Sequence, residues 1–433
     1  MAWDQVVVLD NGSSTAKVGL ASDAAPRVVA PNCTAHVKGQ LKLLVADEVA
    51  TIRNASQLEF TRPFERGHVC NWGCELEVWR RLLIDAEGPL GLGARDRALP
   101  PPGSSALVVS EPPFALPAAQ ATMDEVVFEE LGFAAYHRRP APCMSAVRYS
   151  QTHSRDATAC CVLVVDAGSS STHVMPVCCG RALRASTRRI DVGGALLTNH
   201  LKELLSYRQY NMMDEFMIVN DVKEKLCRIA HEPDRQGGSH LEAALAACNT
   251  GGASAPGPAG PCYAEFVLPD YKDVSEGFVK ELEVFGGARQ KTRPDDTKHQ
   301  VLRLESERLT VPELLFHPID IGLQQAGVAE AIVHAVNSCD PTLRGPMYAH
   351  VLLTGGSAAF PNFARRLESE LRPLVPDCFP ISIEVAEDPV NCAWHGGAAL
   401  ANDDEGLQSA AVTRAEFEER GSWACEERFG EWF

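Results

Sequence analysis

The chain has 433 residues, of which 45% are hydrophobic and 22% are charged, and its 57 acidic and 40 basic residues give a formal net charge of −17. This length exceeds what one hydrophobic core usually supports, so the sequence predicts a globular protein with two domains. The acidic balance argues against attraction to the phosphate backbone of a nucleic acid and suits basic partners.

Fifteen cysteines are present, but their spacing matches neither a zinc site nor a disulfide framework. Two adjacent pairs occur, at 160–161 and 178–179, and no Cys-x-x-Cys motif is repeated. We therefore expect buried free thiols in a reducing compartment. No apolar run approaches the ~20 residues of a membrane-spanning helix, and no signal peptide precedes the first predicted strand. These features predict a soluble protein of the cytosol or nucleus.

The first predicted element is a hairpin over residues 6–20. An apolar run ends in Asp10, a turn rich in Gly and Ser follows at 12–14, and the returning strand carries Lys17. The N–H groups of such a turn form a concave nest for an anion, and the ammonium group of Lys17 could reach the same anion. Taken alone, the hairpin could equally be an ordinary β-turn.

Helical and strand patterns alternate in the next part of the chain. The run 75–84 is amphipathic, and 88–105 is a loop rich in Gly and Pro. A short buried strand is predicted at 106–110, a helix with Pro at its start at 117–131, and another helix at 144–151.

The pattern of the first hairpin recurs at 162–177. The apolar run again ends in an aspartate, Asp166, and Gly168 and three serines follow it. The two aspartates are 156 positions apart (166 − 10). A repeat of this length indicates a duplicated domain rather than a solenoid.

The second half of the chain alternates in the same way. The segment 249–261 is a low-complexity loop, and 270–299 is polar without a firm period. Strands and helices with glycine turns at strand ends indicate an α/β fold. Helices are predicted at 191–207, 214–230, 328–337 and 362–371, a strand at 349–353 and a glycine turn at 354–357.

Several stretches resemble actin in the same order along the chain, so the sequence is identified as a member of the actin and actin-related family. The resemblance implies the duplicated ATPase fold that actin shares with heat-shock chaperones and sugar kinases, with two lobes around a nucleotide cleft. The matching stretches are Asp10-Asn-Gly-Ser with Lys17, and residues 63–72, 217–227, 307–316, 353–357 and 394–397.

The family fold also implies domain limits. Residues 1–155 and 386–433 would form the first lobe, with a small subdomain at 33–70. Residues 156–385 would form the second lobe, with a small subdomain at 195–318 that includes an insertion at 270–299 and the flexible loop at 249–261.

By the same resemblance the cleft would bind ATP or ADP with Mg²⁺. The two hairpin turns would hold the phosphates, and Asp10 and Asp166 would orient the water molecules of the metal ion without binding it directly. Taken alone, Lys223 and its neighbours could instead form a solvated helix face. The residues implied in nucleotide binding are Asp10, Gly12, Ser13, Ser14, Thr15, Lys17, Asp166, Gly168, Ser169, Ser170, Ser171, Gly194, Lys223, Glu224, Gly355, Gly356 and Ser357.

Departures from actin point to weak hydrolysis. Ser169 stands where actin has an acid, and counting back from Tyr149 places Cys143 where actin has the glutamine that positions the attacking water. A thiol orients water poorly. Val390 replaces a lysine beside the adenine, and Phe360 replaces a tyrosine. The sequence therefore predicts a nucleotide-binding protein with little or no catalysis and no catalytic residues of its own.

Residues 197–208, the C-terminal segment from 412 and the insertion resemble the class called actin-related protein six. That class implies a nuclear subunit of an ATP-dependent remodeller that exchanges a variant histone, with the cytoplasm as an alternative location. The implied partners are the remodeller motor and its accessory subunits, with histones or nucleosomal DNA reached through the complex, and no membrane.

The insertion is interpreted as an arm that docks partner subunits, although a tolerated surface insertion is the alternative. Its candidate docking residues are Tyr271, Val274, Phe278, Val279, Leu282, Val284 and Phe285.

Self-assembly into a filament is disfavoured, because Asp320 stands where actin has an aromatic residue in a filament contact. Two other functions are alternatives to that of a remodeller subunit. One is an ATP-hydrolysing, filament-forming cytoskeletal protein, and the other is a small-molecule kinase of the wider superfamily.

Overall fold

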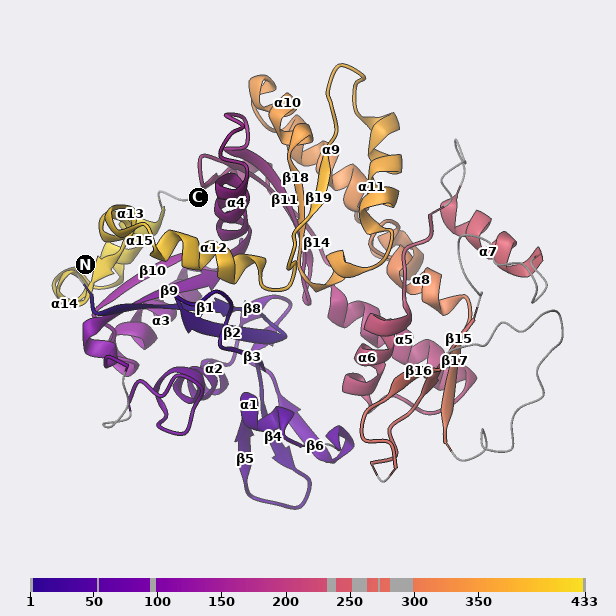
Figure 1. Ribbon diagram of the computed structural model, residues 1–433, viewed down its shortest axis with the longest axis horizontal. Helices are drawn as coiled ribbons and strands as arrows, with labels where there is room; N and C mark the ends of the chain where they lie inside the picture. Colours follow the sequence, from indigo (N-terminus) through magenta and orange to yellow (C-terminus); the bar gives the residue numbers. More distant parts are fainter. Residues whose placement is uncertain are drawn as a thin grey trace.

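Two six-stranded sheets organise the two halves of the computed structural model, which describes residues 3–52, 54–93, 99–231, 239–250, 263–271, 273–280 and 299–430 (Figure 1). The first sheet has the order β20-β10-β9-β1-β2-β3, with β1 (Gln5–Asn11), β2 (Thr15–Leu20), β3 (Val28–Pro31), β9 (Ser105–Glu111), β10 (Ala135–Pro140) and β20 (Val412–Thr413). The second has the order β13-β12-β11-β18-β19, with β14 paired to β12; its strands are β11 (Cys161–Ala167), β12 (Thr172–Cys178), β13 (Arg181–Ala182), β14 (Arg188–Ile190), β18 (Val351–Thr354) and β19 (Ile383–Val385).

The two sheets repeat one another strand for strand around their hairpins. In the antiparallel pair β1–β2, Asp10 lies opposite Lys17, and in β11–β12, Asp166 lies opposite His173. Both members of the second pair follow those of the first by 156 positions (166 − 10 and 173 − 17). Each hairpin also has a parallel neighbour, β9 beside β1 and β18 beside β11. The duplicated α/β fold predicted from the sequence is therefore confirmed.

Helices cover both sheets and bury their apolar faces. In the first half they pack around Trp79, Phe128, Tyr136 and Phe429. Its helices are α2 (Trp72–Trp79), α3 (Pro117–Glu125), α13 (Asp404–Ala410), α14 (Arg414–Arg420) and α15 (Ser422–Gly430). Those of the second half are α5 (Gly194–Arg208), α6 (Phe216–Leu226), α7 (His240–Thr250), α8 (Glu307–Glu313), α9 (Val328–Asn337), α10 (Pro341–Ala349) and α11 (Phe363–Leu371).

Helices α4 (Ala141–Thr152) and α12 (Cys392–Ala401) join the two halves. They pack against each other, α12 against β1 and α4 against β11. Gly396 allows this close approach, because a β-carbon there would lie 1.8 Å from the carbonyl oxygen of Met144. Helix α4 begins three residues before the predicted start at 144, directly after Pro140, whose ring fixes the backbone at the helix entry.

Smaller sheets extend each half at the lower side of Figure 1. The first half carries β4 (Thr34–Val37), β5 (Leu43–Val45) and β6 (Leu58–Thr61), with the short helix α1 (Asp47–Ala50) beside them, and the hairpin β7 (Phe64–Glu65) and β8 (His68–Val69). The second half carries β15 (Ala264–Val267), β16 (Phe278–Lys280) and β17 (Val301–Leu304).

Some sequence predictions differ from the structure or lie outside it. The helix predicted at 214–230 is shorter, because the chain becomes extended at Cys227 (ψ 149°). Nearly all of the low-complexity loop and most of the insertion lie outside the described residues. Most described cysteines are buried, and all of them are free thiols. No helix in the described part of the chain is long and apolar enough to cross a membrane.

Candidate nucleotide site

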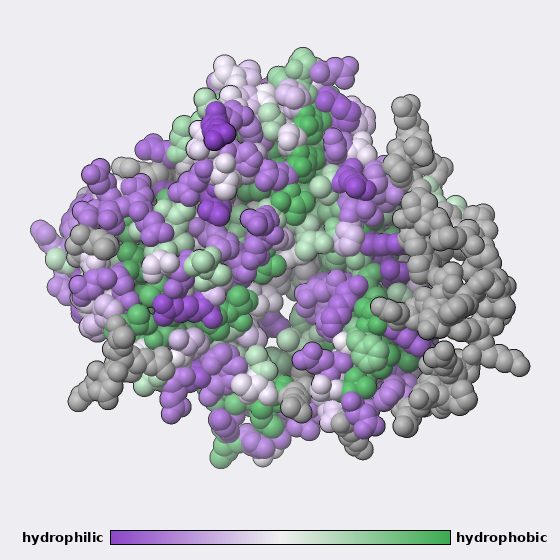
Figure 2. All heavy atoms as spheres, in the orientation of Figure 1, coloured by the Kyte–Doolittle hydropathy of each residue, from purple (hydrophilic) through white to green (hydrophobic). Residues whose placement is uncertain are grey.

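A cleft of about 510 Å³ lies between the two halves. The space-filling view shows the surface hollowed there (Figure 2). Every residue that the sequence implied in nucleotide binding lines this cleft, so segments more than 300 positions apart meet around one volume. The carboxyl ends of the central strands point into it, where α/β sheets commonly bind ligands.

The turns of the two hairpins face each other across the cleft. The Ser170 hydroxyl donates a hydrogen bond to the Ser13 hydroxyl at 2.8 Å. Gly12 is required for the tightness of the first turn, because a β-carbon there would lie 2.7 Å from the Thr15 carbonyl oxygen. Backbone N–H groups and serine hydroxyls therefore approach one small volume from both sides, which is the donor set that phosphate oxygens need.

Two carboxylates and one ammonium group lie at the base of the cleft. Lys17 Nζ is 3.0 Å from Asp10 Oδ2, and the Ser110 hydroxyl donates to Asp10 Oδ1 at 2.6 Å. Burial, followed by the nearby charge of Asp10, raises the pKa of Asp166 to about 6, and Lys17 acts in the opposite direction. A hydrated Mg²⁺ ion fits this arrangement, since a divalent cation would offset the repulsion between the two carboxylates.

The opposite end of the cleft is formed by α6, the start of α5 and the turn after β18. The Lys223 ammonium donates to Gly194 O, Thr198 Oγ1 and Asn220 Oδ1, each at 2.9 Å. Burial lowers the pKa of Lys223. Its three protons are therefore used within the protein, and a nucleoside here would meet mainly its methylene groups. Gly355 has a φ of 86° and leaves no room for a β-carbon.

The expectation for Cys143 is wrong. Its side chain is completely buried and its thiol contacts Met175 at 3.7 Å, away from the cleft. Ala141 and Ser145, two positions to either side on α4, line the cleft instead. Residues two apart point to nearly opposite sides of a helix, so counting back from Tyr149 selected the wrong face.

Other lining residues were missed by the sequence analysis. Ser110 is the last residue but one of β9, and Thr354 is the last residue of β18, the parallel neighbours of the two hairpins. The rule that ligands bind at the carboxyl ends of parallel strands could have found both. Asn11 lies between Asp10 and Gly12 of the first hairpin, and the Pro112–Pro113 pair directly follows β9. Asn220 enters the cleft from α6, one helical turn before Lys223.

Two further hydrogen bonds join the two halves directly. Arg189 Nη2 donates to the Arg66 carbonyl oxygen at 2.6 Å, and the Ser56 hydroxyl donates to Glu215 at 2.7 Å. The structure thus describes a closed form in which side chains of both halves meet.

Four of the seven predicted docking residues are described. Phe278 and Val279 lie on the edge strand β16 and are 49% and 39% exposed. Tyr271 and Val274 precede this strand and are half-buried. Leu282, Val284 and Phe285 lie outside the described residues.

The family model for actin matches residues 2–430. The chain therefore belongs to the actin family, as its duplicated fold and two-sided cleft indicate. It is 38% identical to a protein of Oryza sativa subsp. indica named Actin-related protein 6, 36% to one of that name from Arabidopsis thaliana and 34% to one from Drosophila melanogaster. These alignments cover 98% of this chain and 98%, 99% and 99% of the three relatives.

Proposed function

We propose that the chain is a non-polymerising nuclear subunit of an ATP-dependent chromatin-remodelling complex that exchanges a variant histone, and that it holds ATP or ADP with little or no hydrolysis. The observation that carries the nucleotide part is the convergence of both hairpin turns on one cleft. The relatives named Actin-related protein 6 support the actin-related class. The chromatin part rests on the resemblance of residues 197–208 and the C-terminal segment to that class.

The cleft residues have distinct parts in this proposal. The turns at 12–15 and 168–171 would bind phosphate oxygens, and Lys17 would exchange part of its contact with Asp10 for the nucleotide. Mg²⁺ would neutralise phosphate charge when bound, with Asp10 and Asp166 positioning its water molecules. A ligand held by both halves favours the closed form and adds stability by mass action.

The proposal of weak hydrolysis is supported by the side chains at the start of α4. Ala141 has no polar side-chain group, and the Ser145 hydroxyl donates to the Ala141 carbonyl oxygen at 3.2 Å. The two side chains of α4 that line the cleft therefore provide no amide or carboxylate group to orient an attacking water, and the hydroxyl proton of Ser145 is used within the helix. Ser169 adds no carboxylate beside the metal position. Nucleotide would accordingly act as a structural element across the cleft.

The proposal that the protein does not form filaments is supported by the surface at η7 (Pro318–Ile321). Asp320 is exposed there, beside Ile319, which is 57% exposed. A filament contact at this position would bury an unpaired carboxylate, which is unfavourable. The exposed residues of β16 remain candidates for docking partner subunits, and the net charge of −17 suits basic partners such as histones.

Affinity purification of the tagged chain from nuclear extract, followed by gel filtration, tests the proposal. Co-elution with a Swi/Snf-type motor ATPase in a megadalton-scale assembly is the expected result. A lone monomer would contradict the subunit role, and a polymer that pellets on centrifugation would favour the cytoskeletal alternative. Multiple-turnover hydrolysis at actin-like rates by the pure protein would contradict the structural use of nucleotide.

A further inference from the structure

A buried carboxylic acid lies behind the first phosphate turn. Glu75, in the first turn of α2, has no solvent exposure, and Asn11 Nδ2 donates to its Oε1 at 2.5 Å. Asn11 is the last residue of β1 and directly precedes the turn at 12–14. A side chain of α2 thereby supports the entry to the proposed phosphate site.

The contact continues through Asn32 into the turn itself. Asn32 Nδ2 donates to Asn11 Oδ1 at 3.1 Å and to the Gly12 carbonyl oxygen at 3.0 Å. Its backbone N–H donates to the Ser14 carbonyl oxygen at 2.9 Å. Trp79 Nε1 donates to Asn11 Oδ1 at 3.3 Å. The position of the turn therefore depends on the polar cluster of Glu75, Asn11, Asn32 and Trp79.

Glu75 has no cationic partner among the described residues. Its Oε2 accepts no hydrogen bond there, and neither does the buried Asn32 Oδ1 of the same cluster. Two buried acceptors without a donor are costly, whereas a proton on Glu75 would supply the missing donor. Burial raises the pKa of Glu75 to about 7, although the hydrogen bond from Asn11 and the nearby polar groups of Asn32 and Trp79 lower it.

The ionisable groups of the neighbouring elements do not provide a countercharge. Lys17 of β2 is paired with Asp10 of β1 at 3.0 Å. The Cys74 thiol, next to Glu75 on α2, contacts Thr34. Burial raises the pKa of Cys33, which precedes β4, to about 11, and Arg62, which lowers it, lies over the Phe216 ring. An ionised Glu75 would thus be a buried, unpaired charge behind a turn that is proposed to bind an anion.

We propose that Glu75 is a positioning residue that holds the first phosphate turn in its binding form as a neutral acid, and that its ionisation weakens phosphate binding. This inference rests on the proposed nucleotide-binding function. The ligand class is the phosphate group of a nucleotide. In the neutral form the Glu75 hydroxyl donates to Asn32 Oδ1 and Oε1 accepts from Asn11, so every polar atom between α2 and the turn is paired.

The first test is the pH dependence of stability in the wild type, Glu75→Gln and Glu77→Gln. Glutamine reproduces the hydrogen bonds of the neutral acid, whereas Glu77 is exposed on the same helix and provides a matched loss of charge. The stabilising contribution of Glu75 is fully present below its unfolded pKa of 4.5 and is lost as pH rises through about 7. Between these values Glu75 contributes a rise of about tenfold per pH unit to the unfolding equilibrium constant. Urea denaturation is therefore expected to show a pH slope that is steeper by this factor in the wild type and Glu77→Gln than in Glu75→Gln.

The second test is calorimetric titration with ATP and Mg²⁺ at pH 6 and pH 8. The wild type and Glu77→Gln are expected to bind ATP more weakly than Glu75→Gln at pH 8, by up to about tenfold. This limit follows because pH 8 lies about one unit above the pKa of about 7 of Glu75 in the nucleotide-free protein. Glu75→Met fills a similar volume without hydrogen bonds. This variant is expected to lose the pH dependence as well but to bind ATP less tightly at both pH values, and it keeps the test open if glutamine prevents folding.

The outcomes separate this inference from the proposed function. If unfolding of Glu75→Gln has the same pH slope as unfolding of Glu77→Gln, Glu75 is not a neutral acid in the folded protein, and the inference is overturned. If Glu75→Gln removes the pH slope of unfolding but leaves the pH dependence of ATP affinity unchanged, Glu75 has a purely structural role. That result also overturns the inference. If no variant binds ATP at either pH, the proposed function fails, and the unfolding series still reports whether Glu75 ionises near pH 7.

Discussion

A buried ion pair joins the side chains of two helices in the second half of the protein. Arg366 of α11 and Glu313 of α8 are each 1% exposed, and Arg366 Nη2 lies 2.7 Å from Glu313 Oε1. Arg366 also donates to the Ala230 carbonyl oxygen and to Glu370. Lys17 and Asp10 form a similar pair in the cleft, but there the pair is placed where a ligand could exchange with it.

Replacing Arg366 by methionine is expected to destabilise the protein by about 3 kcal/mol, because the buried Glu313 would keep only the half-exposed His317, at 3.0 Å, as its partner. Urea denaturation measures the loss. Arg365→Met is the matched control, since Arg365 is exposed on the same helix and its replacement is expected to change stability by less than about 0.5 kcal/mol. Equal effects of the two substitutions would contradict the importance of the buried pair.

Replacing Lys17 by methionine is expected to weaken ATP binding by about 10- to 100-fold, which corresponds to the loss of one hydrogen bond to a charged group. Titration calorimetry at fixed Mg²⁺ measures the affinity. Lys38→Met removes an exposed lysine outside the cleft and serves as the control. An affinity unchanged by Lys17→Met would remove this lysine from the proposed phosphate site.

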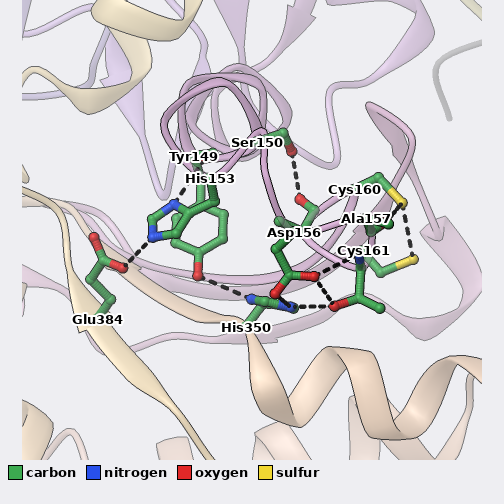
Figure 3. A network of polar contacts seen from close by, with 11 residues as sticks. Tyr149, Ser150, His153, Asp156, Ala157, Cys160, Cys161, His350 and Glu384 are labelled. Atoms are coloured by element: carbon green, nitrogen blue, oxygen red, sulfur yellow. Dashed lines mark hydrogen bonds and ion pairs between the residues drawn. The ribbon is translucent and has the colours of Figure 1, made fainter.

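At the scale of elements, a polar cluster connects the end of α4 to β19 and to the segments that precede β11 and β18 (Figure 3). Tyr149 Oη and His350 Nδ1 are hydrogen-bonded at 3.1 Å, and His350 Nε2 lies 2.9 Å from Thr158 Oγ1. His153 reaches Glu384 of β19 at 3.2 Å. Because α4 also enters the cleft at its other end, this cluster fixes the helix that borders the nucleotide site.

His350→Phe is expected to destabilise the protein by about 1–3 kcal/mol, because it leaves the buried hydroxyl group of Tyr149 without this partner, whereas the exposed Thr158 keeps its hydrogen bond to Asp156. His153→Phe is the comparison: it keeps an aromatic ring over Tyr149 but removes an exposed ion pair, so a loss of less than about 1 kcal/mol is expected. Urea denaturation at pH 7.5 compares the two variants. A larger loss for His153→Phe would show that the surface pair, not His350, holds the end of α4.

At the scale of the whole molecule, the two halves meet through α4, α12 and the contacts across the mouth of the cleft. A nucleotide bound between the hairpin turns would add a further link that only the folded, closed form can make. Since linkage depends on binding and not on turnover, the stabilising effect should not require hydrolysis.

ATP with Mg²⁺ at 100 times its Kd is expected to stabilise the protein by about 2.7 kcal/mol and to raise its Tm. A non-hydrolysable ATP analogue at the same multiple of its own Kd is expected to raise the Tm equally. Differential scanning fluorimetry measures both shifts, with Lys17→Met as the control that responds only at higher nucleotide concentration. A shift with ATP but none with a bound analogue would contradict a purely structural use of nucleotide.

The sequence alone determined the fold class, the two hairpins and the residues of the proposed nucleotide site. The hairpins are local features: an apolar run, an aspartate, a glycine turn and a returning strand follow one another, and their repetition after 156 positions reveals the duplication. The site residues outside the hairpins, such as Gly194, Lys223 and Gly355, were implied by the resemblance to actin. All of the predicted nucleotide-site residues do line one cleft.

Only the tertiary structure decided which side chains support that site. The orientation of α4 about its axis places Cys143 in the core and Ala141 in the cleft. Counting back from Tyr149 along the sequence does not reveal this orientation. The place of Glu75 depends on α2, β1 and the segment before β4 packing together, so nothing in its own stretch of sequence distinguishes it from the exposed Glu77. Burial and the absence of a countercharge arise from contacts between distant segments, which no local pattern contains.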